Sequence, residues 1–279
     1  YNLKVHSHIS TKIYFRHFLT FSMRYGFFSK LQVFLNSRKI FKNWYIYPKV
    51  YYKLINDKFV IFKTKTGLRI KIRVRSTDLM ALTNVWMINE YDVEDFEINT
   101  NDTVIDIGAH IGLFSLLVSQ LCKTGKILSF EPVSENFDLL VSNLKLNHIK
   151  NILPFNMAVS KNSGRLDLFL NNDQSAHSIF SKSSESINVE STSLQKIFEE
   201  HKISSCKILK LDCEGAEYEI IDSLPSEYLD KIQNMVIEYH LADTKPELVK
   251  SLILKIENAG FKIKTRPHYN DMGFLIARK

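Results

Sequence analysis

Short apolar runs and amphipathic segments alternate along the chain from residue 103 onward. Runs such as 104–107 and 207–212 predict buried strands, whereas the apolar positions of 135–147 recur at helical spacing. The pattern predicts strands over 104–107, 126–130, 152–159, 207–212, 235–239, 261–265 and 273–277, and helices over 113–121, 135–147, 216–223 and from 246 to about 260. Strands separated by helices of this length form βαβ units, so we expect an α/β domain with a doubly wound parallel sheet.

Residues 160–193 interrupt this alternation and predict an irregular insert. Within it, residues 165–170 predict a strand, and the polar, serine-rich residues 171–186 predict a loop. A loop of this length in a compact domain is usually functional, so we expect it to shape a ligand pocket.

The chain before residue 103 predicts helices and a hairpin. Residues 10–42 predict two short helices broken near Gly26. The second helix carries an apolar stripe, from which Lys30 and Arg38 point away. That stripe consists of Phe27, Phe28, Leu31, Phe34 and Leu35.

A hairpin and a capped helix follow in the sequence. Residues 58–63 and 68–74 alternate in polarity around a Thr66–Gly67 turn, which predicts the hairpin. Ser76 or Thr77 can cap a helix that runs to about Asn89. We therefore divide the chain into a helical N-terminal segment, 1–56, and a larger part, 57–279. The larger part consists of the hairpin (57–75), a lead-in helix and loop (76–102) and the core (103–279).

Composition indicates a globular protein with a full core. Hydrophobic residues make up 45 % of the 279 positions and charged residues 24 %. Cys122, Cys206 and Cys213 match no zinc or redox spacing, which favours buried apolar roles and a reducing, cytoplasmic compartment. No apolar run has the length of a membrane span, and charged residues interrupt the first 30 positions, so we expect no signal peptide.

Charge is distributed unevenly. Residues 1–56 contain ten Lys or Arg and no Asp or Glu, which leaves 27 basic and 30 acidic residues for the rest of the chain. The segment is also rich in aromatic residues. It either contacts an anionic membrane from the periphery or packs its aromatic residues against the domain or a second subunit. We expect no nucleic acid partner, because the larger part is net acidic and no RNA-binding motif is present.

The sequence DIGAHIG, Asp106 to Gly112, lies where the first strand meets the first helix, the usual ligand site of such a sheet. A dinucleotide fingerprint starting at Gly108 requires glycine at positions 110 and 113, which hold His110 and Leu113. No G-K-[ST] follows either, so a P-loop is excluded. Glu131 ends the second strand and can accept both hydroxyls of a ribose.

In the sequence LKLDCEGAEYE, two acids lie at the carboxyl end of another predicted buried strand. Asp212 and Glu214 point the same way if the chain is still extended there. They could orient a hydroxyl, hold a cation or bond to the turn, whereas Glu214 and Glu217 also fit as acids at a helix N-terminus.

These stretches resemble the FkbM family of S-adenosylmethionine-dependent methyltransferases. The matching pieces, in order, are VIDIGAHIG, FEP, NMAVS, STSL, LKLDCEGAEYEII and VIEYH, and they span about residues 75–279. Gln195 follows STSL where the family usually has Asp. The resemblance implies a Rossmann-like, class I fold with a seven-stranded sheet, the last strand being antiparallel, and methyl transfer to a hydroxyl of a sugar, glycan or small-molecule natural product.

The resemblance also implies site residues. At the cofactor these are Asp106, Gly108, Ala109 and Gly112 around the methionine part, Glu131 at the ribose and Ala158 at the adenine. A hydroxyl acceptor benefits from a general base, for which the candidates are Asp212, Glu214, His177 and His240. Together with Glu238, three of these could collect a divalent cation, which we do not expect. The alternatives are a nicotinamide-dependent dehydrogenase and a non-catalytic, membrane-associated binding module.

Overall fold

A seven-stranded sheet forms the centre of the computed structural model, which describes residues 27–169 and 186–279. Its strand order is β11-β12-β10-β9-β3-β4-β5. The strands are β3 (Thr103–Ile107), β4 (Lys126–Phe130), β5 (Ile152–Phe155), β9 (Cys206–Leu211), β10 (Ile232–Tyr239), β11 (Lys262–Pro267) and β12 (Gly273–Arg278). Only the pairings of β12 are antiparallel, so the predicted mostly parallel sheet with an antiparallel last strand is confirmed.

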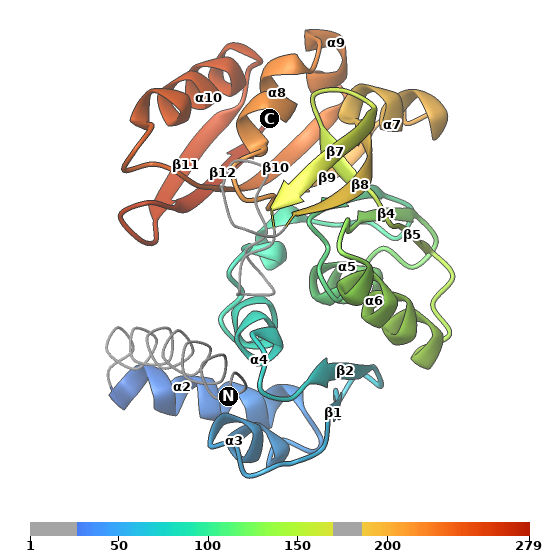
Figure 1. Ribbon diagram of the computed structural model, residues 1–279, viewed down its shortest axis with the longest axis vertical. Helices are drawn as coiled ribbons and strands as arrows, with labels where there is room; N and C mark the ends of the chain where they lie inside the picture. Colours follow the sequence, from blue (N-terminus) through green and yellow to red (C-terminus); the bar gives the residue numbers. More distant parts are fainter. Residues whose placement is uncertain (1–26, 170–185) are drawn as a thin grey trace, which may run out of the picture.

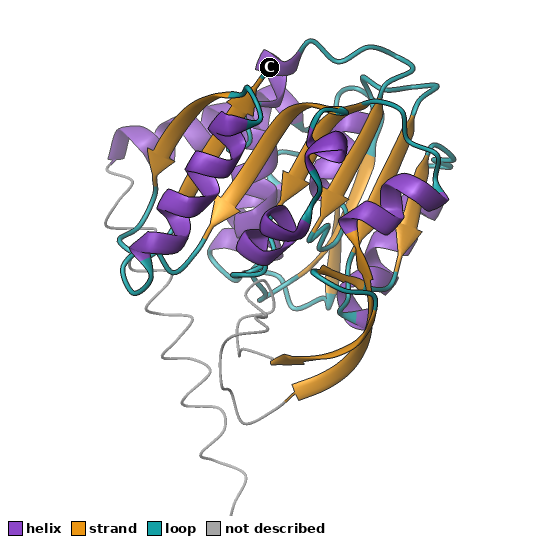
Figure 2. Ribbon diagram, turned by 90° about the horizontal axis from the view of Figure 1, so that it is seen from above, coloured by secondary structure: helices purple, strands orange, loops and turns teal. Residues whose placement is uncertain are grey.

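Helices cover both faces of this sheet (Figures 1 and 2). They are α5 (Leu113–Ser119), α6 (Ser134–Leu146), α7 (Leu194–Glu200), α8 (Glu217–Ser223), α9 (Ser226–Leu229) and α10 (Pro246–Asn258). Alternate side chains of β3 enter different cores: Val104 packs with α5 and α6, and Ile105 packs with α7 and α8. Burial on both faces explains why the strands are almost continuously apolar.

The carboxyl ends of β3 and β9 lie side by side, because these strands pair in parallel. From β3 the sheet continues through β4 on one side and through β9 on the other. Ligands bind where the strand order reverses in this way. The DIGAHIG turn and the LDCEG segment therefore meet at one edge of the sheet.

The region after β5 forms a small second sheet, and here the sequence prediction was wrong. The predicted strand over 152–159 is split: β5 ends at Phe155, and β6 (Ala158–Ser160) pairs instead with β8 (Ser186–Ser193). Asn156 lies at the break, where its side-chain amide donates to the carbonyls of Glu131 and Pro132. The predicted strand at 165–170 is present as β7 (Gly164–Phe169), antiparallel to β8. Most of the predicted loop, residues 170–185, lies outside the described residues.

The N-terminal part packs its inner face into the same core as α5 and α6. Its elements are α2 (Phe27–Ile40), α3 (Ile46–Tyr51), β1 (Phe59–Lys63) and β2 (Arg69–Arg73). The hairpin is present as predicted, with β1 and β2 antiparallel. The Phe41 ring packs against Phe62 at 5.1 Å between centroids, which ties the end of α2 to the hairpin.

Two leucines of the apolar stripe predicted for α2 do not face the core. Leu31 and Leu35 are 43 % and 44 % exposed, whereas Val33, Ser37 and Phe41 are buried. Polarity alone misled because Ser37 can be buried: its hydroxyl donates to the Phe34 carbonyl at 2.7 Å, which satisfies the polar group within the helix. The first predicted helix lies outside the described residues.

The lead-in helix is shorter than predicted. It consists of α4 (Asp78–Leu82) followed by a π-helical turn (Thr83–Met87), and a short 3₁₀ turn (Val93–Phe96) leads to β3. Ser76, not Thr77, supplies the side-chain cap, because its hydroxyl accepts from the Asp78 amide at 3.2 Å. Within residues 27–169 and 186–279, no helix combines the length and apolar character needed to cross a bilayer.

Candidate active site

The turn between β3 and α5 has two positions that require glycine. Gly108 has φ +76°, and a Cβ there would lie 1.8 Å from the Asp212 carbonyl oxygen. Gly112 has φ +86°, and its Cβ would lie 3.1 Å from Cγ of Leu140 on α6. Both glycines therefore serve close packing: Gly108 against the end of β9 and Gly112 against a helix.

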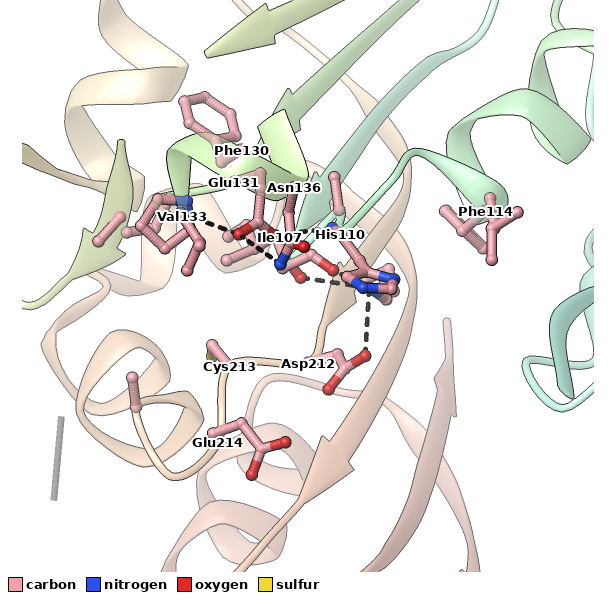
Figure 3. Close-up of a pocket in the computed structure, with 18 of the residues that line it drawn as sticks. Ile107, His110, Phe114, Phe130, Glu131, Val133, Asn136, Asp212, Cys213 and Glu214 are labelled. Carbon is pink, nitrogen blue, oxygen red and sulfur yellow. Dashed lines mark hydrogen bonds and ion pairs between the residues drawn. The ribbon is translucent and has the colours of Figure 1, made fainter. Parts of the chain in front are cut away.

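Glu131 is held at the end of β4 by backbone donors. Its two carboxylate oxygens accept the amides of His110 at 2.8 Å and Val133 at 2.9 Å. The residue is 5 % exposed, and burial raises its pKa to about 7 although these hydrogen bonds oppose the shift. Figure 3 shows the carboxylate beside His110 at the cavity. It can accept a further hydrogen bond from a bound ribose.

His110 links the turn to the N-terminal hairpin. Its Nε2 lies 3.3 Å from Nη2 of Arg73 and 3.5 Å from Oδ1 of Asp78. Arg73 and Asp78 form a buried bidentate pair, and Arg73 also donates to Asn136 on α6 at 2.7 Å. Burial lowers the pKa of His110, and Arg73 adds to that effect against the opposing charge of Asp78. A neutral His110 thus fixes the turn rather than carrying charge.

Lys210 of β9 is a buried cation between two acids. Its Nζ lies 3.2 Å from Asp106 and 3.4 Å from Asp212, and donates to the Gly108 carbonyl at 2.7 Å. Burial alone would lower its pKa, but Asp106 and Asp212 outweigh burial and raise it above the usual range. Asp106 is fully buried and also accepts from the Ser115 hydroxyl at 2.6 Å. The acid of the turn therefore lies behind the cavity, where it pairs with Lys210.

Asp212 lies at the cavity with one carboxylate oxygen engaged. The Tyr91 hydroxyl donates to its Oδ2 at 2.9 Å, and the Lys210 contact falls on the same oxygen. Its side chain keeps 24 % of its surface exposed. Asp212 lines the cavity opposite Glu131 (Figure 3).

Asp212 and Glu214 do not share the extended geometry that would point their side chains the same way. Glu214 has φ +54°, so the chain turns after Asp212. Its carboxylate lies 3.5 Å from Nε2 of His240, whose Nδ1 lies 3.2 Å from the fully buried Glu217. Burial alone would lower the pKa of His240, but Glu217 and Glu214 raise it well above normal. The raised pKa favours the imidazolium form of His240, which cannot accept a proton, and this makes Asp212 the preferred candidate for the base.

One set of side chains near the cavity could hold a cation. Asp212, Glu238 and His240 place one ligand atom each within 4.8 Å of one another. Lys210 already supplies positive charge there, and the acids around His240 raise its pKa and so favour its charged form. The expectation of no resident metal stays a prediction.

The cavity beside these polar groups also has an apolar lining. Its apolar lining includes Phe130, Val133, Met157, Ala158, Val159 and Leu168. Six of the predicted site residues line the cavity: Gly108, Ala109, Glu131, Ala158, Asp212 and Glu214. Three others do not line it: Asp106, Gly112 and His240. His177 lies outside the described residues.

Sequence reasoning missed Tyr91 and Lys210 as site residues. A lysine within the apolar run LKLD was a signal, since buried charges are paired. Tyr91 carried no signal, because it lies 121 positions from its partner Asp212.

The sheet order and the single antiparallel strand, together with the glycine turn beside Glu131, define a class I, Rossmann-like methyltransferase fold. The family model of the Methyltransferase FkbM domain matches residues 106–263. The chain belongs to this family of S-adenosylmethionine-dependent methyltransferases, which removes the dehydrogenase and binding-module alternatives.

Curated relatives bear methyltransferase names. "Methyltransferase sdnD" of Sordaria araneosa is 26 % identical over 207 residues, covering 62 % of this chain and 78 % of that protein. "Methyltransferase 1" of Beauveria bassiana (strain ARSEF 2860) is 24 % identical over 195 residues, covering 62 % and 76 %.

Among solved structures, a precorrin-6y C5,15-methyltransferase from Geobacter metallireducens GS-15 aligns with a TM-score of 0.45 and 14 % identity over 70 % of this chain and 88 % of that one. M. jannaschii TYW2, solved with AdoMet, aligns with a TM-score of 0.43 and 15 % identity over 80 % and 85 %.

Proposed function

We propose that the protein transfers the methyl group of S-adenosylmethionine to a hydroxyl of a sugar, glycan or small-molecule natural product. The observation that carries this proposal is the position of Asp212. Its carboxylate lines the cavity beside the glycine turn, and both Tyr91 and Lys210 contact Oδ2. Oδ1 is thus the oxygen that would face an acceptor.

When bound, S-adenosylmethionine would supply the methyl group for an in-line displacement, in which the acceptor oxygen would gain the methyl as the bond to sulfur breaks and a neutral thioether is left. The hydroxyl proton of the acceptor would pass to Oδ1 of Asp212. The leaving group needs no acid, so the protein contributes mainly through positioning and the base.

The cofactor would be held by groups that follow β3 and β4 and by the first residue of β6. The carboxylate of Glu131 would accept the ribose hydroxyls, and the wall at Ala158 would contact the adenine. The backbone from Gly108 to His110 lines the cavity where the methionine part would lie.

A labelled-methyl assay tests the proposal. Labelled S-adenosylmethionine is offered with panels of sugars, lipid-linked sugars and small alcohols, each paired with its amine and thiol analogue. We expect label on oxygen, and we expect Asp212→Asn to abolish it while Asp222→Asn, at an exposed acid on α8, does not. Label only on nitrogen, sulfur or carbon would overturn the assignment to hydroxyl acceptors.

A further inference from the structure

We infer that the outer surface of α2 and α3 docks on an anionic lipid bilayer. We call this surface, residues 30–54, the basic apolar surface. It lies in the N-terminal part of the molecule, at the opposite end from α10 and β11 (Figure 1). The inference is independent of the acceptor proposed above.

Exposed apolar side chains are concentrated there. The described residues contain ten large hydrophobic residues that are exposed, and five of them fall within positions 31–54. These five are Leu31, Leu35, Tyr45, Tyr52 and Leu54. Tyr52 and Leu54 are 67 % and 72 % exposed. An apolar patch on an otherwise polar surface marks an interaction site.

The core does not account for these side chains. Val33, Phe41, Tyr47 and Val50 already anchor the segment in the core with α5 and α6. The leucine pair on α2 repeats at i and i+4, which makes one face of the helix outward and apolar. The outer face of α2 is therefore available to a partner other than the domain itself.

The charge of the basic apolar surface indicates the kind of partner that it binds. Residues 30–54 include six basic residues and no acidic one: Lys30, Arg38, Lys39, Lys42, Lys49 and Lys53. All six are exposed. Arg38 lies over the Trp44 ring at 5.2 Å, and Lys49 lies over the Tyr45 ring at 5.7 Å, so cations sit directly beside aromatic faces. Basic groups among Leu and Tyr side chains suit lipid headgroups above an acyl interior.

Other partners fit less well. A second copy of this surface would bring twelve like charges together around a small apolar contact, which disfavours a symmetric dimer through it. A nucleic acid would satisfy the lysines, but its phosphates offer nothing to Leu31, Leu35 and Leu54. An anionic bilayer satisfies both kinds of side chain.

Vesicle flotation of the full chain tests the inference. Vesicles of phosphatidylcholine alone are compared with vesicles that also contain phosphatidylglycerol. We expect flotation only with the anionic vesicles, and we expect added salt to weaken it. Lys39→Gln, Lys42→Gln and Lys49→Gln combined should lower the partition coefficient at least about tenfold, and Leu31→Ser with Leu35→Ser should also lower it.

Matched controls lie elsewhere on the surface. Lys250→Gln, Lys262→Gln and Lys264→Gln remove the same charge, and Leu121→Ser with Leu254→Ser removes exposed leucines from α10 and the α5–β4 connection. Circular dichroism and S-adenosylmethionine binding confirm that each variant is folded. The inference is overturned if the chain does not float, or if the controls lose as much binding as the variants. Dimerisation abolished by the Leu31 and Leu35 changes, without flotation, would assign the surface to a second copy.

Discussion

The hydroxyl of Tyr91 donates a 2.9 Å hydrogen bond to Oδ2 of Asp212, across 121 positions of sequence. Tyr91 precedes β3, outside the residues 106–263 that match the family model. Its ring is fixed edge-to-face against Phe114 at 5.5 Å. The lead-in segment thereby orients the carboxylate of Asp212, the proposed base. Its other oxygen, Oδ1, would then face the cavity.

Replacing Asp212 by Asn should lower kcat at least about 100-fold, because general base catalysis contributes in that range. The side chain is close to isosteric, so the Kd for S-adenosylmethionine should stay within about threefold. Steady-state kinetics and calorimetry measure the two quantities, with Asp222→Asn as the control. A variant that keeps full kcat excludes Asp212 as the base.

Tyr91→Phe should lower kcat at least about tenfold, because the Asp212 carboxylate loses the hydroxyl that orients it and a misplaced catalytic group costs rate. Steady-state kinetics measure kcat of the variant and of the unchanged protein. Tyr47→Phe is the matched control, since that buried hydroxyl bonds to Thr83 away from the cavity. An equal change in both variants would mean that Tyr91 acts only through stability.

Glu131→Gln should flatten the pH dependence of unfolding. The folded pKa of Glu131 is about 7, above its ordinary value of 4.5, so the folded state binds this proton more tightly. Its contribution is fully present below about pH 4.5 and is lost as pH rises through 7. Denaturant titrations of both proteins between these pH values measure the effect. Parallel curves would show that Glu131 ionises freely in the folded protein.

Lys210→Met should lower the free energy of unfolding by about 3–5 kcal/mol, because it leaves buried Asp106 without its cation. Lys207→Met on the same strand serves as the control, with an expected change under about 1 kcal/mol, typical of a substitution away from such features. Chemical denaturation compares the two. Similar losses would show that the Lys210 ion pair adds no stability.

Treatment with a chelator should leave kcat and KM within about twofold, a change of free energy too small to reflect loss of a catalytic ion. Lys210 and His240 already neutralise the acids near Asp212. Assays after dialysis against EDTA, with and without added Mg²⁺, measure this. Activity that disappears and returns with Mg²⁺ would instead assign a cation to Asp212, Glu238 and His240.

The sequence by itself determined the strand and helix alternation, the glycine turn and the acid at the end of β4, because local periodicity and motif spacing encode them. It also determined the family, through motifs such as LKLDCEGAEYE. It did not determine which face of α2 is covered. Ser37 is buried whereas Leu31 and Leu35 are exposed, and only the packing of the helix on the domain decides this.

Only the tertiary structure decided the roles around Asp212. The sequence offered His240 as a base, and the structure surrounds it with three acids, of which Glu217 and Glu214 contribute most to raising its pKa. The family resemblance implied a place for Asp106 at the cofactor, whereas the structure buries this acid beside Lys210 and outside the cavity lining. The charge state of a side chain depends on neighbours that only the folded chain brings together. The Tyr91–Asp212 hydrogen bond and these ion pairs join distant positions, so no periodic pattern in the sequence predicts them.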